Sequence, residues 1–392
     1  MAEEVTANES KRPPLDERTR RAVDDLCRWI GYASVSSTSN DAVNESIADR
    51  LRGIGFDVDV QRFRDASGVP KSNVVAVRDG GDGPGSAYFA HSDVVPADEW
   101  TGPGGDPFTG VIHERRVYGR GACDMKGSLA AMVAAAGDVP PERQSGPVSI
   151  VVTADEEVGF LGARTVRDHP VYRDAVRRQP IAVIGEPTSM RPVHGHKGVT
   201  VAWVTSRGEA AHSATGGGVN ATDAMVPMLT RLSDWSRRLR SDPAFHHADF
   251  DPVHGSLNYG VAAVPGAINV VPAVCRAWVM LRTMPGVDDS PMWDDLRRCA
   301  DENDLQFRET HRGEPVLVSQ DSDHVRTVER LTGHPSTTVS YGTDGGEYDE
   351  LHRRIVLGPG DIAQAHTADE FITIEQLRRG VDVFATLIEN GE

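Results

Sequence analysis

Apolar and polar positions along the chain follow two different periods. Residues 16–33 and 43–54 place apolar side chains three or four positions apart, which predicts two amphipathic helices. Short β-branched runs closed by turn residues follow and predict buried strands, and a stretch of small residues at 127–136 predicts a helix between them. The predicted strands lie at residues 73–77, 86–90, 148–153 and 181–184.

Strands that alternate with helices indicate an α/β fold, and nearly all-apolar strands indicate a sheet that is covered on both faces. After residue 190 alternating strands and longer helices predict a smaller α+β unit with an antiparallel sheet, and after residue 313 the buried-strand pattern returns. We therefore predict a discontinuous α/β domain of residues 1–192 and 312–392 that is interrupted by an inserted domain of residues 193–311.

Composition and charge narrow the classes of function. The chain has 392 residues, of which 39% are hydrophobic and 25% charged, as in globular proteins of two domains. A formal net charge of −17 opposes binding to nucleic acid or to an anionic membrane, and the chain has neither a secretory signal core nor a run of about 18 apolar residues. Four scattered cysteines without a CxxC pair suit a reducing compartment. We expect a cytoplasmic protein with no nucleic-acid or membrane partner.

Acids and histidines follow the ends of several predicted strands. Because the carboxyl ends of parallel strands meet at one edge of a sheet, we expect these side chains to converge in one crevice. Each has an ordinary alternative by itself, such as a turn histidine or an acid in the first turn of a helix, but that alternative would have to hold at five strand ends. The residues concerned are His91, Asp93, Asp124, Asp155, Glu156, Glu157, Glu186 and His366.

Two imidazoles and at least four carboxylates form the donor set of a paired divalent metal site. If Asp124 is shared, each metal receives one histidine and one further carboxylate, and one glutamate of the pair Glu156–Glu157 stays free to move protons. Asp93 lies two residues from His91 and could accept the second ring N–H of that histidine. The sequence predicts two divalent metal ions, zinc first, with cobalt or manganese as alternatives.

Six stretches of the chain carry a family resemblance. In this order they resemble the di-zinc aminoacylase and carboxypeptidase family, peptidase family M20, which includes acetylornithine deacetylase, succinyl-diaminopimelate desuccinylase and glutamate carboxypeptidases. The resemblance implies a zinc-hydrolase catalytic domain with a mainly parallel mixed sheet, and a ferredoxin-like inserted domain that serves as lid and dimerisation domain. The stretches are AHSDVVP, GRGACDMKGSLAAM, TADEEVGFLGAR, IGEPTSMRPVHGHKG, GEAAHSATGGGVNA and LGPGDIAQAHTADE.

The resemblance also implies the metal ligands. His91 and Glu186 match ligands of one metal, and Glu157 and His366 match ligands of the other. Asp124 matches the carboxylate that bridges the two.

Further positions match residues that act on the substrate. Glu156 resembles the general base, and Asp93 resembles the residue that orients the first histidine. His212 matches a histidine that reaches into the active site of the partner subunit of a homodimer, where it helps to stabilise the oxyanion. Asn269 and Arg282 match positions of the inserted domain that hold the carboxylate end of the substrate.

The motifs favour a hydrolase of N-acyl amino acids that resembles the acetylornithine deacetylases of amino-acid biosynthesis. The alternatives are succinyl-diaminopimelate desuccinylase, which HSDVVP and YGRGACDMKGSLAAM resemble at least as much, and a dipeptidase or carboxypeptidase of the same fold. A protein that kept the fold but lost turnover should lack Glu156 or a ligand, and none is missing. In the loop YGTDGGEYDE, Asp344 or Glu347 could pair with a substrate ammonium, or both could be surface acids.

Overall fold

A computed structural model of the chain describes residues 15–263 and 267–391, and these residues divide into two compact units. Unit 1 contains residues up to 192, residues 323–335 and the chain from 351 onward, and unit 2 contains residues 193–322 and 336–350. The residues after 312 that join unit 2 do so because β13 (Val316–Leu317) and β14 (Thr337–Val339) both pair with β8 (Val193–His196). The catalytic and lid roles of the predicted domains remain a prediction.

Unit 1 is built around a mixed sheet with the strand order β1-β2-β6-β3-β7-β15. The strands β6, β3, β7 and β15 run parallel, so their carboxyl ends all lie at the same edge of the sheet. At one end of the strand order, β2 is antiparallel to β6, and β1 is antiparallel to β2. Every residue of β3, β6 and β7 is buried, which confirms the prediction of strands covered on both faces. The strands are β1 (Asp57–Arg64), β2 (Pro70–Arg78), β3 (Ser86–His91), β6 (Val148–Thr153), β7 (Ile181–Ile184) and β15 (Arg354–Val356).

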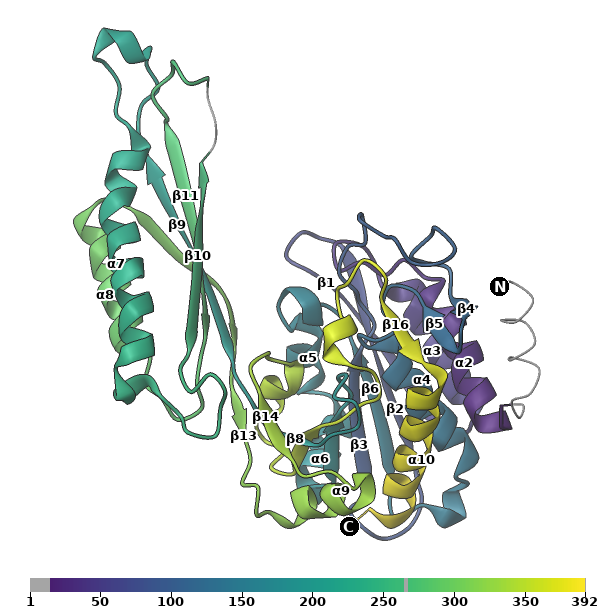
Figure 1. The fold of residues 1–392 in the computed structure, drawn as a ribbon. Helices are drawn as coiled ribbons and strands as arrows, with labels where there is room; N and C mark the ends of the chain where they lie inside the picture. Colours follow the sequence, from purple (N-terminus) through teal and green to yellow (C-terminus); the bar gives the residue numbers. More distant parts are fainter. Residues whose placement is uncertain (1–14, 264–266, 392) are drawn as a thin grey trace, which may run out of the picture. The chain divides into compact units, whose positions relative to one another are not determined.

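Helices cover both faces of this sheet, with α2, α4 and α10 on one side and α5 and α6 on the other (Figure 1). The helix α4 packs against both α2 and α10, and its run of alanines and glycines is almost entirely buried because small side chains let the neighbouring helices approach. A separate three-stranded sheet has the order β16-β5-β4. These elements are α2 (Glu17–Ile30), α3 (Asp41–Arg52), α4 (Lys126–Asp138), α5 (Leu161–Val166), α6 (Pro170–Arg178), α9 (Asp323–Thr332), α10 (Ile374–Asn390), β4 (Val111–His113), β5 (Arg116–Tyr118) and β16 (Phe371–Thr373).

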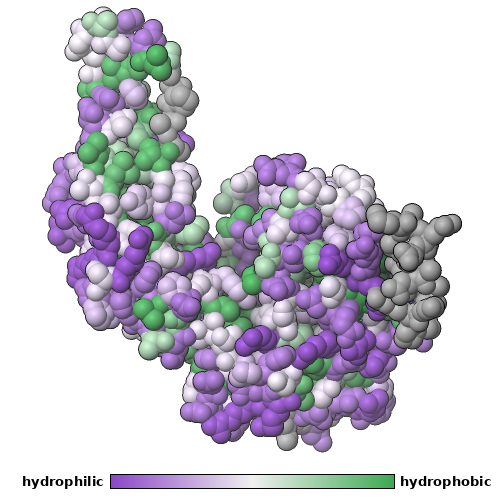
Figure 2. All heavy atoms as spheres, in the orientation of Figure 1, coloured by the Kyte–Doolittle hydropathy of each residue, from purple (hydrophilic) through white to green (hydrophobic). Residues whose placement is uncertain are grey.

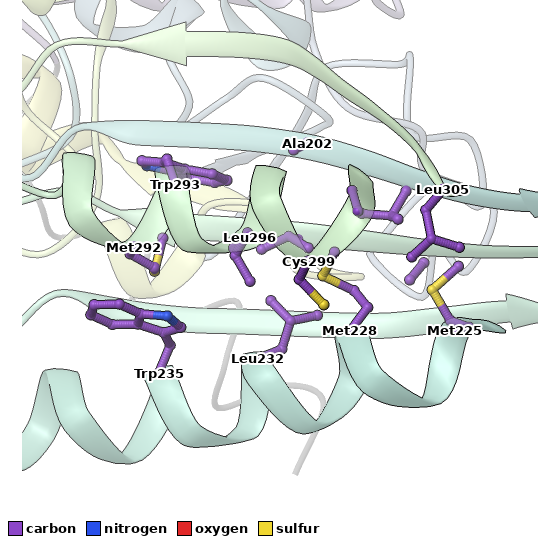
Figure 3. Packing of buried hydrophobic residues seen from close by; sticks show 14 of the residues in the cluster. Ala202, Met225, Met228, Leu232, Trp235, Met292, Trp293, Leu296, Cys299 and Leu305 are labelled. Carbon is purple, nitrogen blue, oxygen red and sulfur yellow. The ribbon is translucent and has the colours of Figure 1, made fainter. Parts of the chain in front are cut away.

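Unit 2 contains a four-stranded antiparallel sheet of order β10-β11-β9-β12 and two helices. The elements follow one another as βαββαβ, which is the ferredoxin-like arrangement, so this part of the predicted fold class is confirmed. Alternate residues of β11 face the helices, and Figure 3 shows the methionine, leucine and tryptophan side chains of α7 and α8 that pack there. The elements are β9 (Val199–Arg207), α7 (Ala221–Ser241), β10 (Ser256–Ala263), β11 (Val274–Arg282), α8 (Ser290–Glu302) and β12 (Gln306–Gly313).

Short 3₁₀ helices occupy several loops, and two of them carry residues that the sequence singled out. Hydrophilic residues cover much of the visible face of unit 1 (Figure 2). Among the described residues, no helix is both long and apolar enough to cross a membrane. The 3₁₀ helices are η1 (Pro141–Arg143), η2 (Glu156–Val158), η3 (Ser213–Thr215), η4 (Pro243–Phe245), η5 (Asp344–Tyr348) and η6 (Ile362–Gln364).

Candidate metal centre

The acids and histidines at the strand ends of unit 1 come together in the structure. His91 is the last residue of β3, Glu186 follows β7 by two residues, and η2 begins at Glu156, three residues after β6. Asp124 lies in the turn before α4, and His366 lies in the loop after η6. The parallel sheet therefore delivers these side chains from separate segments to the same edge, as expected for a site at strand carboxyl ends.

The first group of donors consists of His91, Asp124 and Glu186. Their donor atoms lie within 4.8 Å of one another, and all three residues are buried. Nε2 of His91 is 3.1 Å from Oδ1 of Asp124 and 3.8 Å from Oε1 of Glu186. One imidazole and two carboxylates thus face a common point, where they could hold a metal ion.

The second group consists of Asp124, Glu157 and His366, whose donor atoms also lie within 4.8 Å of one another. Nε2 of His366 is 3.1 Å from Oε1 of Glu157 and 3.3 Å from Oδ2 of Asp124. Asp124 therefore directs one carboxylate oxygen toward each histidine, and it is the only residue common to both groups. Among the described residues these are the two groups with metal-binding geometry.

Electrostatics at the two groups favour bound cations. Hydrogen bonds with Asp124 and Glu157 raise the pKa of His366 to about 10. Burial opposes the charged form of His91, but the hydrogen bond with Asp124 and the charges of Glu186 and Glu156 raise its pKa well above the usual range. Both pKa values are raised because several carboxylates surround the two imidazoles, and the same carboxylates would stabilise bound cations. The donor set fits two divalent ions.

Asp93 positions the backbone of Glu156 and Glu157 as well as the ring of His91. Nδ1 of His91 is 2.9 Å from the backbone oxygen of Asp93 and 3.7 Å from its carboxylate. The carboxylate instead accepts hydrogen bonds from Ser36 Oγ at 2.7 Å and from the backbone N–H groups of Glu156 and Glu157 at 3.2 and 3.4 Å. Asp93 therefore links the loop after β3 to the start of η2.

Lys71 is a supporting residue that the sequence did not reveal. It is buried, its Nζ lies 2.6 Å from Oδ1 of Asp155, and it donates to the backbone oxygens of Ser36 and Thr38. Asp155 has a φ of 62°, a left-handed conformation that turns the chain just before Glu156. The only available signal was that lysine is rare in the chain, at positions 11, 71, 126 and 197.

Replacing Asp155 by Asn tests how much this buried pair contributes. Asparagine tolerates the left-handed conformation, but it leaves the ammonium of Lys71 buried without its carboxylate. We expect the free energy of unfolding, measured by urea titration with circular dichroism, to fall by about 3 kcal/mol. Adding Lys71→Met should recover part of the loss.

Asp174→Asn is the control for this prediction, because Asp174 pairs with Arg177 and Arg178 on the exposed side of α6. Its expected cost is at most about 1 kcal/mol. Equal losses for Asp155→Asn and Asp174→Asn would contradict the structural role given to the Lys71–Asp155 pair.

The residues predicted to contact substrate from the inserted domain lie at two ends of unit 2. His212 is exposed, begins η3 by accepting a hydrogen bond from the N–H of Ala214, and forms a β-bridge with Val270, beside Asn269. Arg282 is the last residue of β11, whereas the first residue of β11 follows Asn269 and Val270 by only a few positions. At about 3.4 Å per residue, Arg282 lies roughly 27 Å along the strand from the start of β11. The structure brings His212 and Asn269 together and separates both from Arg282.

Asp344 and Glu347 are both buried, with exposed fractions of 2% and 8%, so the reading of these residues as surface acids is wrong. Both lie in η5, where the hydroxyl of Tyr348 donates to Oδ2 of Asp344. Nearby, Oγ1 of Thr343 is 3.1 Å from Nε2 of His196. The loop is therefore an ordered part of unit 2 rather than a solvated turn.

An α/β unit with two histidine–carboxylate groups that share one aspartate, interrupted by a ferredoxin-like unit, is the arrangement expected of a metal-dependent hydrolase. The chain belongs to peptidase family M20/M25/M40, because the sequence model of this family matches residues 87–390. The resemblance read from the six sequence stretches is therefore confirmed.

Relatives of known name agree with this family. The chain is 35% identical over 379 residues to acetylornithine deacetylase of Myxococcus xanthus, with 93% of this chain and 95% of that protein covered. It is 32% identical over 378 residues to acetylornithine deacetylase of Proteus mirabilis (strain HI4320), with 92% and 94% covered.

Solved structures of the family share the fold. An M20 family metallo-carboxypeptidase from Sulfolobus solfataricus matches with a TM-score of 0.74 and 15% identity, over 96% of this chain and 99% of that chain. A dinuclear metal binding peptidase of the family from Bacillus subtilis matches with a TM-score of 0.63 and 15% identity, over 95% and 97%. At these identities the likeness shows the fold alone.

Proposed function

We propose that this protein hydrolyses the amide bond of N-acyl amino acids, with N-acetyl-ornithine as the first substrate to test. The observation that carries the proposal is that Asp124 is shared by two donor groups. Glu156, which neither group contains, directly precedes the donor Glu157 in the chain. The choice of substrate class is supported by relatives named acetylornithine deacetylase that are 30–35% identical over more than nine tenths of the chain.

The two donor groups would hold two divalent cations. His91, Asp124 and Glu186 would bind one ion, and Asp124, Glu157 and His366 the other. Bound there, the ions would polarise the amide carbonyl and lower the pKa of a water molecule. Imidazole and carboxylate donors suit zinc first, and cobalt and manganese are the alternatives for an oxygen-rich site.

Glu156 is the residue that we assign to proton transfer. Neither donor group uses it, and the bond from its N–H to Asp93 fixes the backbone from which its side chain extends. Its carboxylate would take a proton from the attacking water as the carbon–oxygen bond forms. It would then give that proton to the nitrogen of the leaving amine as the carbon–nitrogen bond breaks.

Unit 1 would act as the catalytic domain, and unit 2 as lid and dimerisation domain of a homodimer. His212 and Asn269 lie at the opposite end of β11 from Arg282, so two copies of unit 2 would be needed to bring all three to one substrate. Exposed apolar side chains flank the His212 segment, namely Val219, Ile268 and Val270, and Figure 2 shows hydrophobic residues along the visible face of unit 2.

Within such a dimer, His212 of one copy would donate a hydrogen bond to the oxyanion formed in the other copy. Arg282 offers a guanidinium fork for the substrate carboxylate. All four cysteines, which lie in the described part of the chain, are free thiols, and this suits the reducing cytoplasm.

A substrate panel tests the proposal. Protein reconstituted with zinc, cobalt or manganese is assayed with N-acetyl-ornithine, N-succinyl-diaminopimelate and dipeptides, and kcat/KM is compared. We expect N-acetyl-ornithine to exceed the others by at least about 10-fold. Fastest turnover of a dipeptide or of the succinyl substrate would overturn the assignment of substrate, and metal-loaded protein that turns over none of them would overturn the proposed function.

A further inference from the structure

Glu370 is a fully buried carboxylate that neither donor group contains. Its exposed fraction is 0%. Oε1 accepts hydrogen bonds from the backbone N–H groups of Cys123 at 2.8 Å and Asp124 at 3.0 Å. Oε2 accepts from the N–H of Gly121 at 3.2 Å and pairs with Nη1 of Arg120 at 2.5 Å. Four donors from one short segment therefore converge on one side chain.

Arg120 extends the same connection in the opposite direction. Its Nη2 donates to the backbone oxygens of Thr367 at 3.1 Å and Pro96 at 3.3 Å. In addition, the N–H of Gly119 donates to the backbone oxygen of Glu370. The segment that ends in Asp124 is thus bound to the segment that follows His366 by side-chain and backbone hydrogen bonds, although the two are more than 240 positions apart in sequence.

These two segments supply two of the three members of the second donor group. Oδ2 of Asp124 lies 3.3 Å from Nε2 of His366. This separation must be kept for both donor atoms to lie close to Glu157. The first group depends on this connection only through Asp124, since His91 and Glu186 come from the ends of β3 and β7. Loss of the connection should therefore affect the two groups unequally.

We propose that Glu370 is a positioning residue that holds Asp124 and His366 in register, so that the Asp124–Glu157–His366 group can bind its metal. The inference rests on the proposed function only in treating that group as a metal site. Residues that orient metal ligands commonly change metal affinity by about 10- to 100-fold when they are replaced. Glu370 contacts neither the ion nor the substrate in this proposal.

Glu370→Gln is the variant that tests the proposal. The amide keeps the shape of the side chain, but it replaces one accepting oxygen with an NH₂ group, which must face either Gly121 and Arg120 or Cys123 and Asp124. Calorimetric titration of the metal-free protein with cobalt should show a first ion bound as in the wild type and a second bound at least about 10-fold more weakly. At two equivalents of cobalt, the visible absorption spectrum should show a smaller contribution from the second ion than in the wild type.

Asp25→Asn is the matched control. Asp25 is buried like Glu370 and belongs to neither donor group, and its Oδ2 pairs with Nε of Arg50 at 2.7 Å. This variant should lower the melting temperature but bind two cobalt ions with wild-type affinity and spectrum. If Glu370→Gln behaves in the same way, with lower stability and unchanged binding of both ions, Glu370 is only structural and the proposal is overturned.

A milder variant keeps the test decisive if Glu370→Gln does not fold. Arg120→Lys retains a positive charge beside Glu370 but cannot reach both Thr367 and Pro96 as a guanidinium fork does. We expect it to weaken the second cobalt ion by a smaller factor, and unchanged affinity would count against the proposal. A wild-type protein that binds fewer than two cobalt ions would instead contradict the proposed function, so the two failures are distinguishable.

Discussion

Glu156→Gln is expected to lower kcat for the best substrate by about 1000-fold, because general acid–base catalysis commonly contributes between about 100-fold and 10,000-fold. Glutamine matches glutamate in size, but it can neither accept a proton from water nor return one to the leaving amine. Glu156 belongs to neither donor group, so both metals should remain bound. Stopped assays for kcat and metal analysis of the dialysed variant measure the two effects separately.

Glu157→Gln is the matched control, since it makes the same chemical change one residue further on. Oε1 of Glu157 lies 3.1 Å from Nε2 of His366 in the second donor group, so this variant should lose affinity for one metal. The pair of variants therefore separates proton transfer from metal binding. Glu156→Gln with near wild-type kcat would show that another group carries the proton.

Asp124→Asn is expected to abolish detectable turnover by weakening both metals at once. Asp124 presents Oδ1 to the group with His91 and Oδ2 to the group with His366, and an amide can offer an oxygen to only one of them. The change also removes a negative charge that both ions would share. Metal content after dialysis, measured by inductively coupled plasma spectrometry, should fall well below one ion per chain.

Glu186→Gln is the comparison for this prediction, because Glu186 belongs to the first donor group alone. It should weaken one metal and leave the other in place. Equal metal content in Asp124→Asn and Glu186→Gln would show that Asp124 does not serve both groups.

The arrangement of elements could be predicted from the sequence because it is written in local periodicity. Buried runs such as 148–153 and 181–184 are strands in the structure, and the acids that follow them lie at one edge of the sheet. The alternating strands and long helices after residue 190 form the ferredoxin-like unit. In each case a few neighbouring residues carry the whole signal.

The supporting residues could not be predicted, because their partners are distant in sequence. Lys71 pairs with Asp155, and Glu370 binds the segment of residues 120–124, and no local pattern marks either connection. The burial of Asp344 was hidden for a related reason. An acid before two glycines is ordinarily exposed, but a Cβ at Gly346 would lie 2.1 Å from the backbone oxygen of Glu314, so this loop packs directly against the chain after β12.

All the donor residues belong to unit 1, whereas residues 193–322 form an insertion with a hydrophobic core of its own. That insertion can therefore accumulate substitutions, or change the length of its loops, without moving any donor atom. Asn269 and Arg282, the residues proposed to hold the substrate carboxylate, lie in the insertion, so under that proposal the metal donors and these substrate contacts are encoded in separable stretches of the gene. Under the same proposal, such a division would let the substrate contacts change while the metal donors stay as they are.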